Sequence, residues 1–210
     1  MIAIERRGFM LVLSSPSGGG KTTIAKRLLQ YDDNLTLSIS CTTRPKRPKE
    51  VEGVDYYFID KEDFEEKAKN KEFYEYEFVY GNYYGTPKRK VNQALNYGID
   101  VLFDIDWQGT RRLISKARAD VVSIFILPPS MEELNRRLSK RGEDSEVVII
   151  DRMKRAANEI SHYDEYDYVI INRTIEESIL KVNHILKSER LRRIRQHSLS
   201  DYVDNLLDGA

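Results

Sequence analysis

The sequence predicts an α/β fold in which helices flank a parallel sheet built around a P-loop. Three observations lead to this prediction. A buried strand, a glycine-rich loop and an amphipathic helix follow one another within residues 8–29. Strand and helix patterns then alternate along most of the chain, which favours parallel strands joined by helical crossovers. Residues 41–86 break this alternation and indicate an inserted lobe of mixed strands.

The first strand and helix enclose a loop that is typical of phosphate binding. Residues 9–13 form an apolar run, and Ile24 and Leu28 give the next segment a helical apolar stripe. The three glycines between them let backbone N–H groups turn toward an anion at the helix N-terminus. Lys21 would reach the terminal phosphates, and Thr22 would place a hydroxyl on Mg²⁺. Ser15 replaces the first glycine of the Walker A pattern, so a simple helix-capping turn is the alternative.

The remaining elements follow in order. Strands are predicted at "LTLSI", "GIDVLFDID", "DVVSIFIL" and "YDYVIIN", which cover residues 35–39, 98–106, 120–127 and 166–172. Helices are predicted at residues 87–97, 108–118, 131–140, 146–161 and 175–196. Capping boxes support two of these starts, Ser130 with Glu133 and Thr174 with Glu177.

The interval 41–86 holds residues suited to an acceptor. It contains a charged loop, a short strand "YYFI", a helix begun by Asp60 and a tyrosine-rich strand region. Seven of the chain's 13 tyrosines lie in it, and Arg44 and Arg47 stand in a proline-stiffened loop. Guanidinium and phenol groups that converge would bind a phosphate monoester, whereas a solvated surface loop is the alternative. Glu75 and Glu77 share one face of a strand, for which solvation is the default.

Composition excludes several classes of protein. The 34 basic and 34 acidic residues cancel, so no global charge favours nucleic acid or an anionic membrane. A single cysteine, Cys41, excludes an internal disulfide and suits a reducing cytoplasm. No apolar run approaches the about 20 residues of a membrane span, and "FMLVL" is too short for a signal-peptide core. The basic cluster at residues 190–195 is expected to be a solvated helix face rather than a nucleic-acid site.

Six motifs together resemble one family. "SSPSGGGKT", "SISCTTRPKRPKEVEGVDYYF", "GNYYGTP", "DIDWQG", "RLSKRG" and "VIINR" are similar, in order and spacing, to the motif series of guanylate kinases, over nearly all of residues 8–190. The resemblance implies an ATP:GMP phosphotransferase that works by direct, Mg²⁺-assisted transfer. The implied ATP-binding residues are Ser17, Gly18, Gly19, Gly20, Lys21, Thr22, Thr23 and Asn172.

The resemblance also implies how GMP would be bound. The GMP phosphate falls to Arg44, Arg47, Tyr56 and Tyr84, and the guanine base to Ser40, Glu75 and Thr86. The chemistry agrees, because a carboxylate can accept from both N1–H and N2 of guanine while a hydroxyl donates to O6. Adenine lacks the N1 proton and would leave the carboxylate partly unpaired.

Asp104 and Asp106 are two residues apart at the end of a predicted strand, so they project to the same side. The resemblance favours Asp106 for a site shared by the metal and GMP, with Thr22 as the other metal residue. Asp106 could instead cap the next helix.

Residues 131–158 are expected to form a mobile lid. Arg137 and Arg141 lie one helical turn apart, and Arg152 follows a polar loop. In the family, positions like these three face ATP and the transferred phosphoryl group, and with Lys21 they are the expected catalytic residues. The expected division is a P-loop core at 1–40, 87–130 and 159–197, a GMP-binding lobe at 41–86, the lid at 131–158 and a C-terminal tail at 198–210.

Two functional classes stay open at this point. One is the phosphotransferase, with ATP and GMP as substrates and a monomer or homodimer as its assembly. The other is a guanylate-kinase-like binding module without catalysis, which would not need Lys21, Thr22 or the lid arginines. Among enzymes, a kinase for another nucleoside monophosphate is the nearest alternative.

Overall fold

The computed structural model describes residues 5–79, 81–140 and 146–209. Its main sheet has five parallel strands in the order β2-β7-β1-β8-β9, as the alternating pattern predicted. Their bounds are β1 Met10–Ser14, β2 Leu35–Leu37, β7 Asp100–Asp104, β8 Val121–Leu127 and β9 Tyr168–Ile171.

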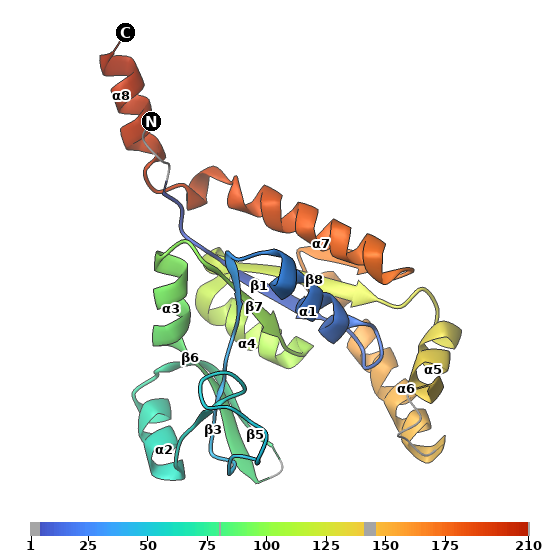
Figure 1. Cartoon of the computed structure of the whole chain (residues 1–210). Helices are drawn as coiled ribbons and strands as arrows, with labels where there is room; N and C mark the ends of the chain where they lie inside the picture. Colours follow the sequence, from blue (N-terminus) through green and yellow to red (C-terminus); the bar gives the residue numbers. More distant parts are fainter. Residues whose placement is uncertain (1–4, 80, 141–145, 210) are drawn as a thin grey trace.

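Helices cover both faces of this sheet, with α7 over one face and α3 and α4 over the other (Figure 1). The bounds are α1 Lys21–Tyr31, α3 Lys88–Asn96, α4 Trp107–Ala117 and α7 Ile175–Arg190, and short 3₁₀ turns at Arg118–Asp120 and Tyr163–Glu165 lead toward β8 and β9. Leu11 and Leu13 of β1 pack toward α1 and α7, whereas Met10 and Val12 pack toward α3 and α4. The strand is therefore apolar throughout because both of its faces are buried.

A second sheet lies within the interrupting interval. Its order is β4-β3-β6-β5, with β3 parallel to β4 and the other pairs antiparallel. The bounds are β3 Cys41–Thr42, β4 Tyr57–Phe58, α2 Lys61–Lys69, β5 Phe73–Val79 and β6 Asn82–Pro87. Asp60 caps α2 as predicted, and a separate small core forms around Phe64 and Phe73. The prediction that this interval contains a lobe of mixed strands is confirmed.

Helices α5, Met131–Lys140, and α6, Glu146–Ile160, pack on each other through Leu134, Leu138 and Ala156 at one end of the sheet (Figure 1). Ser130 accepts from the Glu133 N–H at 3.1 Å, so this predicted start is confirmed. Only half of the capping box forms, because the Glu133 carboxylate pairs with Arg136 and Arg137 instead.

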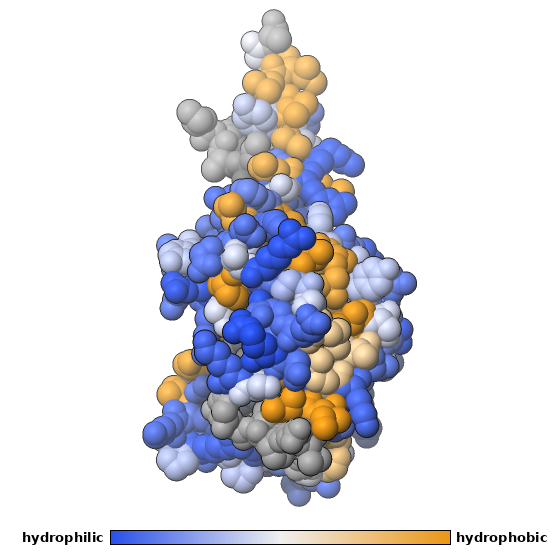
Figure 2. Space-filling model, turned by 90° about the vertical axis from the view of Figure 1, so that its right-hand side faces the viewer, coloured by the Kyte–Doolittle hydropathy of each residue, from blue (hydrophilic) through white to orange (hydrophobic). Residues whose placement is uncertain are grey.

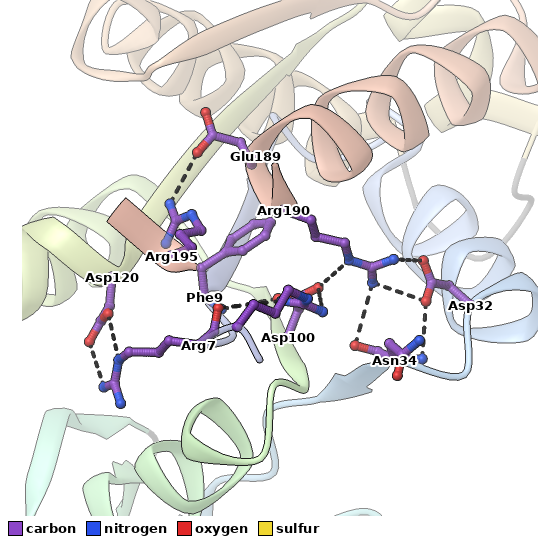
Figure 3. A network of polar contacts seen from close by, with 10 residues as sticks. Arg7, Phe9, Asp32, Asn34, Asp100, Asp120, Glu189, Arg190 and Arg195 are labelled. Carbon is purple, nitrogen blue, oxygen red and sulfur yellow. Dashed lines mark hydrogen bonds and ion pairs between the residues drawn. The ribbon is translucent and has the colours of Figure 1, made fainter. Parts of the chain in front are cut away.

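The helix predicted over residues 175–196 is too long. Helix α7 ends at Arg190, and a 3₁₀ turn at Arg193–Arg195 brings the chain back toward the sheet. Arg195 lies 4.4 Å from the Phe9 ring and pairs with Glu189 at 3.0 Å, and its carbonyl accepts from the Arg7 N–H at 2.7 Å (Figure 3). A straight continuation of α7 would carry Arg195 away from all three partners, so tertiary contacts override helix propensity here.

The basic cluster at residues 190–195 is only partly the solvated face that was expected, because Arg192 and Arg193 are exposed whereas Arg190 and Arg195 are largely buried. Arg190 bonds both Asp32, at 2.8 Å, and the fully buried Asp100, at 2.7 Å (Figure 3). Arg6 bonds the other side of Asp100, also at 2.7 Å. These ion pairs join the start of β7, the end of α1 and the end of α7 at the amino edge of the sheet.

The C-terminal segment, which the sequence analysis set apart as a tail, forms a further helix, α8, Leu199–Asp208. It projects from the body, shortly after the bridge between Gln196 and Arg6 (Figure 1). Val203, Leu206 and Leu207 are exposed on it, and apolar side chains line this projection in Figure 2.

Candidate active site

The glycine loop joins the carboxyl end of β1 to the start of α1. Gly18 and Gly20 have positive φ angles of 86° and 100°, which only glycine adopts without strain. A Cβ on Gly20 would lie 2.4 Å from the Asn172 Nδ2 atom, so a larger residue cannot fit. Residues 15–18 and 20–23 line a cavity of about 260 Å³ that Asp106 and Glu159 complete. The predicted phosphate loop therefore has the backbone shape that anion binding needs.

Lys21 and Thr22 meet the same carboxylate. The Lys21 Nζ atom lies 2.7 Å from one Asp104 oxygen, and the Thr22 hydroxyl donates to the other at 3.2 Å. Lys21 also donates to the Ile105 carbonyl at 3.3 Å. Because Asp104 ends β7, which neighbours β1, the lysine, hydroxyl and carboxylate form one cluster at the carboxyl edge of the sheet.

Asp106 has a different local role. Its side chain accepts from the Gly109 N–H at 2.8 Å and caps α4, which is the alternative that the sequence left open. Asp106 nevertheless lines the cavity at the P-loop. That Asp106 contributes to a site shared by the metal and GMP stays a prediction. The carboxylate that contacts Thr22 is that of Asp104.

Asn172 is fully buried behind the P-loop. Its amide donates to the Gly19 carbonyl at 2.8 Å and accepts from the Ser178 hydroxyl at 2.9 Å. These bonds hold the loop in shape. The expected contact with adenine stays a prediction, while the geometry assigns Asn172 to positioning the loop.

The three arginines expected in the lid are described by the structure in different detail. Arg137 donates to Glu133 at 2.8 Å and to the Asn172 carbonyl at 3.2 Å, beside a cavity of about 460 Å³ that Gly18, Gly20 and Thr23 help to line. Arg152 lies partly buried in α6. Arg141 lies outside the described residues.

Glu159 was missed by the sequence reasoning. It extends from the end of α6, and its Oε2 atom accepts from the Ser17 N–H of the P-loop at 3.2 Å. Burial raises the pKa of this carboxyl, although Ser17 and Lys21 oppose the shift. A lone glutamate near a helix end carries no sequence signal, because the contact joins segments far apart in the chain.

The lobe brings a second polar cluster together. The Arg44 guanidinium lies 5.5 Å from the Tyr56 ring, and Tyr56 and Tyr84 meet edge to face at 5.8 Å. Arg44 also pairs with Glu50 at 2.7 Å, and this bond lowers the pKa of Glu50. Three of the four predicted phosphate-binding side chains therefore converge.

Arg47 and Ser40 are placed less tightly. Arg47 is exposed, and its backbone N–H donates to Glu50 at 2.8 Å. Ser40 lies partly buried just before β3, with its carbonyl accepting from the Tyr57 N–H at 2.9 Å. Ser40 directly precedes the lobe sheet and Arg47 lies in the loop between β3 and β4, and their roles stay predictions.

Glu75 is not on a solvated face. Its side chain is 12% exposed, and Thr86 donates a hydrogen bond to its Oε1 atom at 2.7 Å. Burial raises the pKa of Glu75, whereas the Thr86 bond and Arg112 lower it. The Glu77 side chain, two residues along the strand, is half exposed. Of these two carboxylates, only that of Glu75 is largely buried.

Comparisons with known proteins agree with this geometry. Residues 7–189 match the protein family described as guanylate kinase. The chain belongs to the guanylate kinase family. It is 55% identical to the guanylate kinase of Novosphingobium aromaticivorans over 99% of this chain and 94% of the relative. For the guanylate kinase of Paramagnetospirillum magneticum the identity is 52%, over 98% and 96% of the two chains. The crystal structure of guanylate kinase from Anaplasma phagocytophilum matches with a TM-score of 0.74 and 42% identity, and covers 96% of each chain.

As a guanylate kinase the chain is an enzyme, a nucleoside monophosphate kinase that phosphorylates GMP. The binding-module alternative is thereby set aside, in agreement with the intact cluster at Lys21 and Thr22. No helix in the described part of the chain is long and apolar enough to cross a membrane.

Proposed function

We propose that phosphoryl transfer takes place between the Lys21 cluster at the carboxyl edge of the main sheet and the polar cluster of the lobe. The observation that carries this proposal is the meeting of Lys21, Thr22 and Asp104 where the P-loop enters α1. Residues 41–86 would act as the GMP-binding lobe and residues 131–158 as the lid over the donor.

On the donor side, ATP phosphates would lie in the P-loop against N–H groups of residues 17–23. Lys21 would leave Asp104 and turn its charge toward the β and γ phosphates. Arg137, Arg141 and Arg152 would face the moving phosphoryl group, whose charge spreads over three oxygens. The cavity of about 460 Å³ beside Arg137 supports a nucleoside in that position.

The donor site also fits Mg²⁺. Thr22 and Asp104 offer oxygen ligands, the kind that Mg²⁺ prefers, and Asp106 borders the same cavity. In the described ranges no group of three or more His, Cys, Asp or Glu side chains could hold a metal ion. Mg²⁺ commonly needs only one or two protein oxygens beside substrate phosphates and water. When bound it would neutralise charge on the β and γ phosphates, while Lys21 and the arginines orient them.

On the acceptor side, the GMP phosphate would lie among Arg44, Arg47, Tyr56 and Tyr84. Arg44 would share its guanidinium between Glu50 and the phosphate, because its fork has more donors than Glu50 uses. Glu75 would accept from guanine N1–H and N2. Thr86 already donates to Glu75, so the Ser40 hydroxyl is the better placed donor for O6.

The experiment that tests this function measures ADP production with GMP, AMP, CMP and UMP in parallel. We expect GMP to exceed the other three by a factor of about 10⁴ or more in kcat/KM, because a buried carboxylate left unpaired strongly disfavours the wrong base. Comparable rates with AMP would contradict the role of the lobe in reading guanine.

A further inference from the structure

One charged side chain of the main body reaches the base-reading part of the lobe. Arg112 lies on α4, the helix that begins directly after Asp106. Its Nη2 atom is 3.2 Å from Glu77 Oε2 and 3.9 Å from Glu75 Oε2, both on β5. The guanidinium is 35% exposed, so the interaction is only partly screened by water.

The position of Glu75 makes this neighbour important. Its carboxylate is 12% exposed and has one hydrogen bond from Thr86. Asp106 and Glu77 face it with like charge and raise its pKa further, while burial is the largest cause of the increase. Among these neighbours, Thr86 and Arg112 are the ones that favour the ionised form.

Within the described residues, Arg112 is the one cation that forms an ion pair with the Glu75 carboxylate. Lys116, one turn after Arg112 on α4, interacts with Glu75 through space and is itself repelled by Lys88 and Arg112. No salt bridge joins Lys116 to Glu75 within the residues that the structure describes, so Arg112 supplies the near positive charge. The Arg112 Nε atom is buried without a hydrogen-bond partner in the same residues, so the guanidinium retains an unused donor.

We propose that Arg112 is a positioning residue for base recognition, which holds the Glu75 carboxylate anionic and oriented from its place on α4. This inference rests on the proposed function, in which Glu75 accepts from both guanine donors. A protonated Glu75 could accept only weakly and would present its own proton to guanine N1–H. Arg112 would thus act on guanine through Glu75 without touching it.

Replacing Glu77 should shift the pKa of Glu75 in the opposite direction to replacing Arg112. Glu77 is half exposed and lies nearer to Arg112 than Glu75 does, so it competes for the same Nη2 donor. Removing the charge of Glu77 frees Arg112 for Glu75 and removes a repulsion. Removing the charge of Arg112 does the reverse.

The experiment measures kcat/KM for GMP against pH in wild type, Arg112→Gln, Arg112→Lys and Glu77→Gln. Glu75 must be ionised, so activity falls as pH drops through its pKa. Losing Arg112 raises that pKa, and we expect the acid limb of Arg112→Gln to move up by about one pH unit. Arg112→Lys should restore much of the shift, and Glu77→Gln should move the limb down. The change should lie in KM for GMP, with kcat and KM for ATP nearly unchanged.

Arg111→Gln is the matched control. Arg111 is the neighbouring arginine on α4, but it pairs with Glu165 and forms no ion pair with Glu75 in the part of the chain that the structure describes. An acid limb that moves no further in Arg112→Gln than in Arg111→Gln would overturn the inference. Glu75→Gln separates this failure from failure of the proposed function. If Glu75→Gln left the preference for GMP over AMP unchanged, the base-reading role of Glu75 itself would be wrong.

Discussion

Asp104 and Asp106 lie two residues apart, yet their side chains have different partners. Asp104 meets Lys21 and Thr22, while Asp106 caps α4. The sequence could place both carboxylates near the P-loop, because strand ends meet at one edge of a parallel sheet. It could not decide between them, because that choice depends on where β7 stops and α4 begins. Element boundaries are the least predictable feature of a sequence.

The role of Lys21 gives the first prediction at this scale. Lys21→Ala should nearly abolish turnover and leave a folded protein that still binds GMP. The residues proposed to bind the GMP phosphate lie in the lobe and do not include Lys21. Steady-state ADP release and GMP titration by calorimetry measure the two effects. Lys26→Ala, an exposed lysine on the same helix, is the control and should keep near-normal turnover. Normal turnover in Lys21→Ala would remove the donor-site assignment.

At the scale of elements, α5 and α6 carry Arg137 and Arg152, two of the three arginines proposed to meet the phosphoryl group. Arg152→Ala should lower kcat much more than GMP affinity. An arginine at the transferring group can contribute about 10³ to 10⁵ in rate, and sharing with Arg137 and Arg141 should reduce the loss to roughly 10². Arg155 lies three residues after Arg152 on α6, is exposed and pairs with Asp151. Arg155→Ala should therefore change kcat little. A change confined to KM for ATP would make Arg152 a ground-state binder instead.

Most elements follow from local pattern, and the exceptions have tertiary causes. The caps at Asp60, Ser130 and Thr174 could be read directly, because each polar side chain bonds an N–H three residues ahead. The end of α7 could not, because it is set by the return of Arg195 to Phe9 and Glu189. The contact of Glu159 with Ser17 is hidden for the same reason: its partners are 142 residues apart.

At the scale of the whole molecule, the ion pairs around Asp100 join segments that meet only in the folded chain. A single sequence cannot show that Arg6, Arg190 and Asp100 belong together, since no local periodicity relates them. They lie at the start of β7, whereas Asp104 ends it about 13 Å away. The network therefore stabilises the fold at the edge opposite the active site.

Arg190→Ala should lower the free energy of unfolding by about 2 to 4 kcal/mol, because it removes one of the two arginines that pair with the buried Asp100 and also removes the arginine that pairs with Asp32. Urea denaturation measures the loss. Arg192→Ala removes a half-exposed ion pair with Glu189 and should cost less than about 1 kcal/mol. Equal losses of unfolding free energy in the two variants would show that the buried ion pairs of Arg190 stabilise the fold no more than the ion pair of Arg192.

The same network predicts the acid sensitivity of the fold. Burial alone would raise the pKa of Asp32, but bonds from Arg190 and Asn34 outweigh it and the pKa is lowered. A lowered folded-state pKa gives stability that is present above the unfolded value of about 4 and is lost as pH falls through the folded value. Arg190→Ala should therefore lose less stability than wild type between pH 5 and pH 2, as scored by Tm. An identical pH dependence in both proteins would contradict this account of Asp32.

The central claim is that Glu75 reads guanine from within the lobe, and one ratio tests it. Glu75→Gln replaces an acceptor oxygen with a donor that faces a guanine donor, so kcat/KM for GMP should fall by roughly 10 to 150 fold. Activity on AMP should fall less or rise, because the amide can donate to the unprotonated adenine N1. The measurement is kcat/KM for GMP divided by that for AMP, in wild type and in the folded variant. We predict a ratio at least tenfold lower in the variant, as expected for loss of one charge-assisted hydrogen bond; an unchanged ratio would contradict the claim.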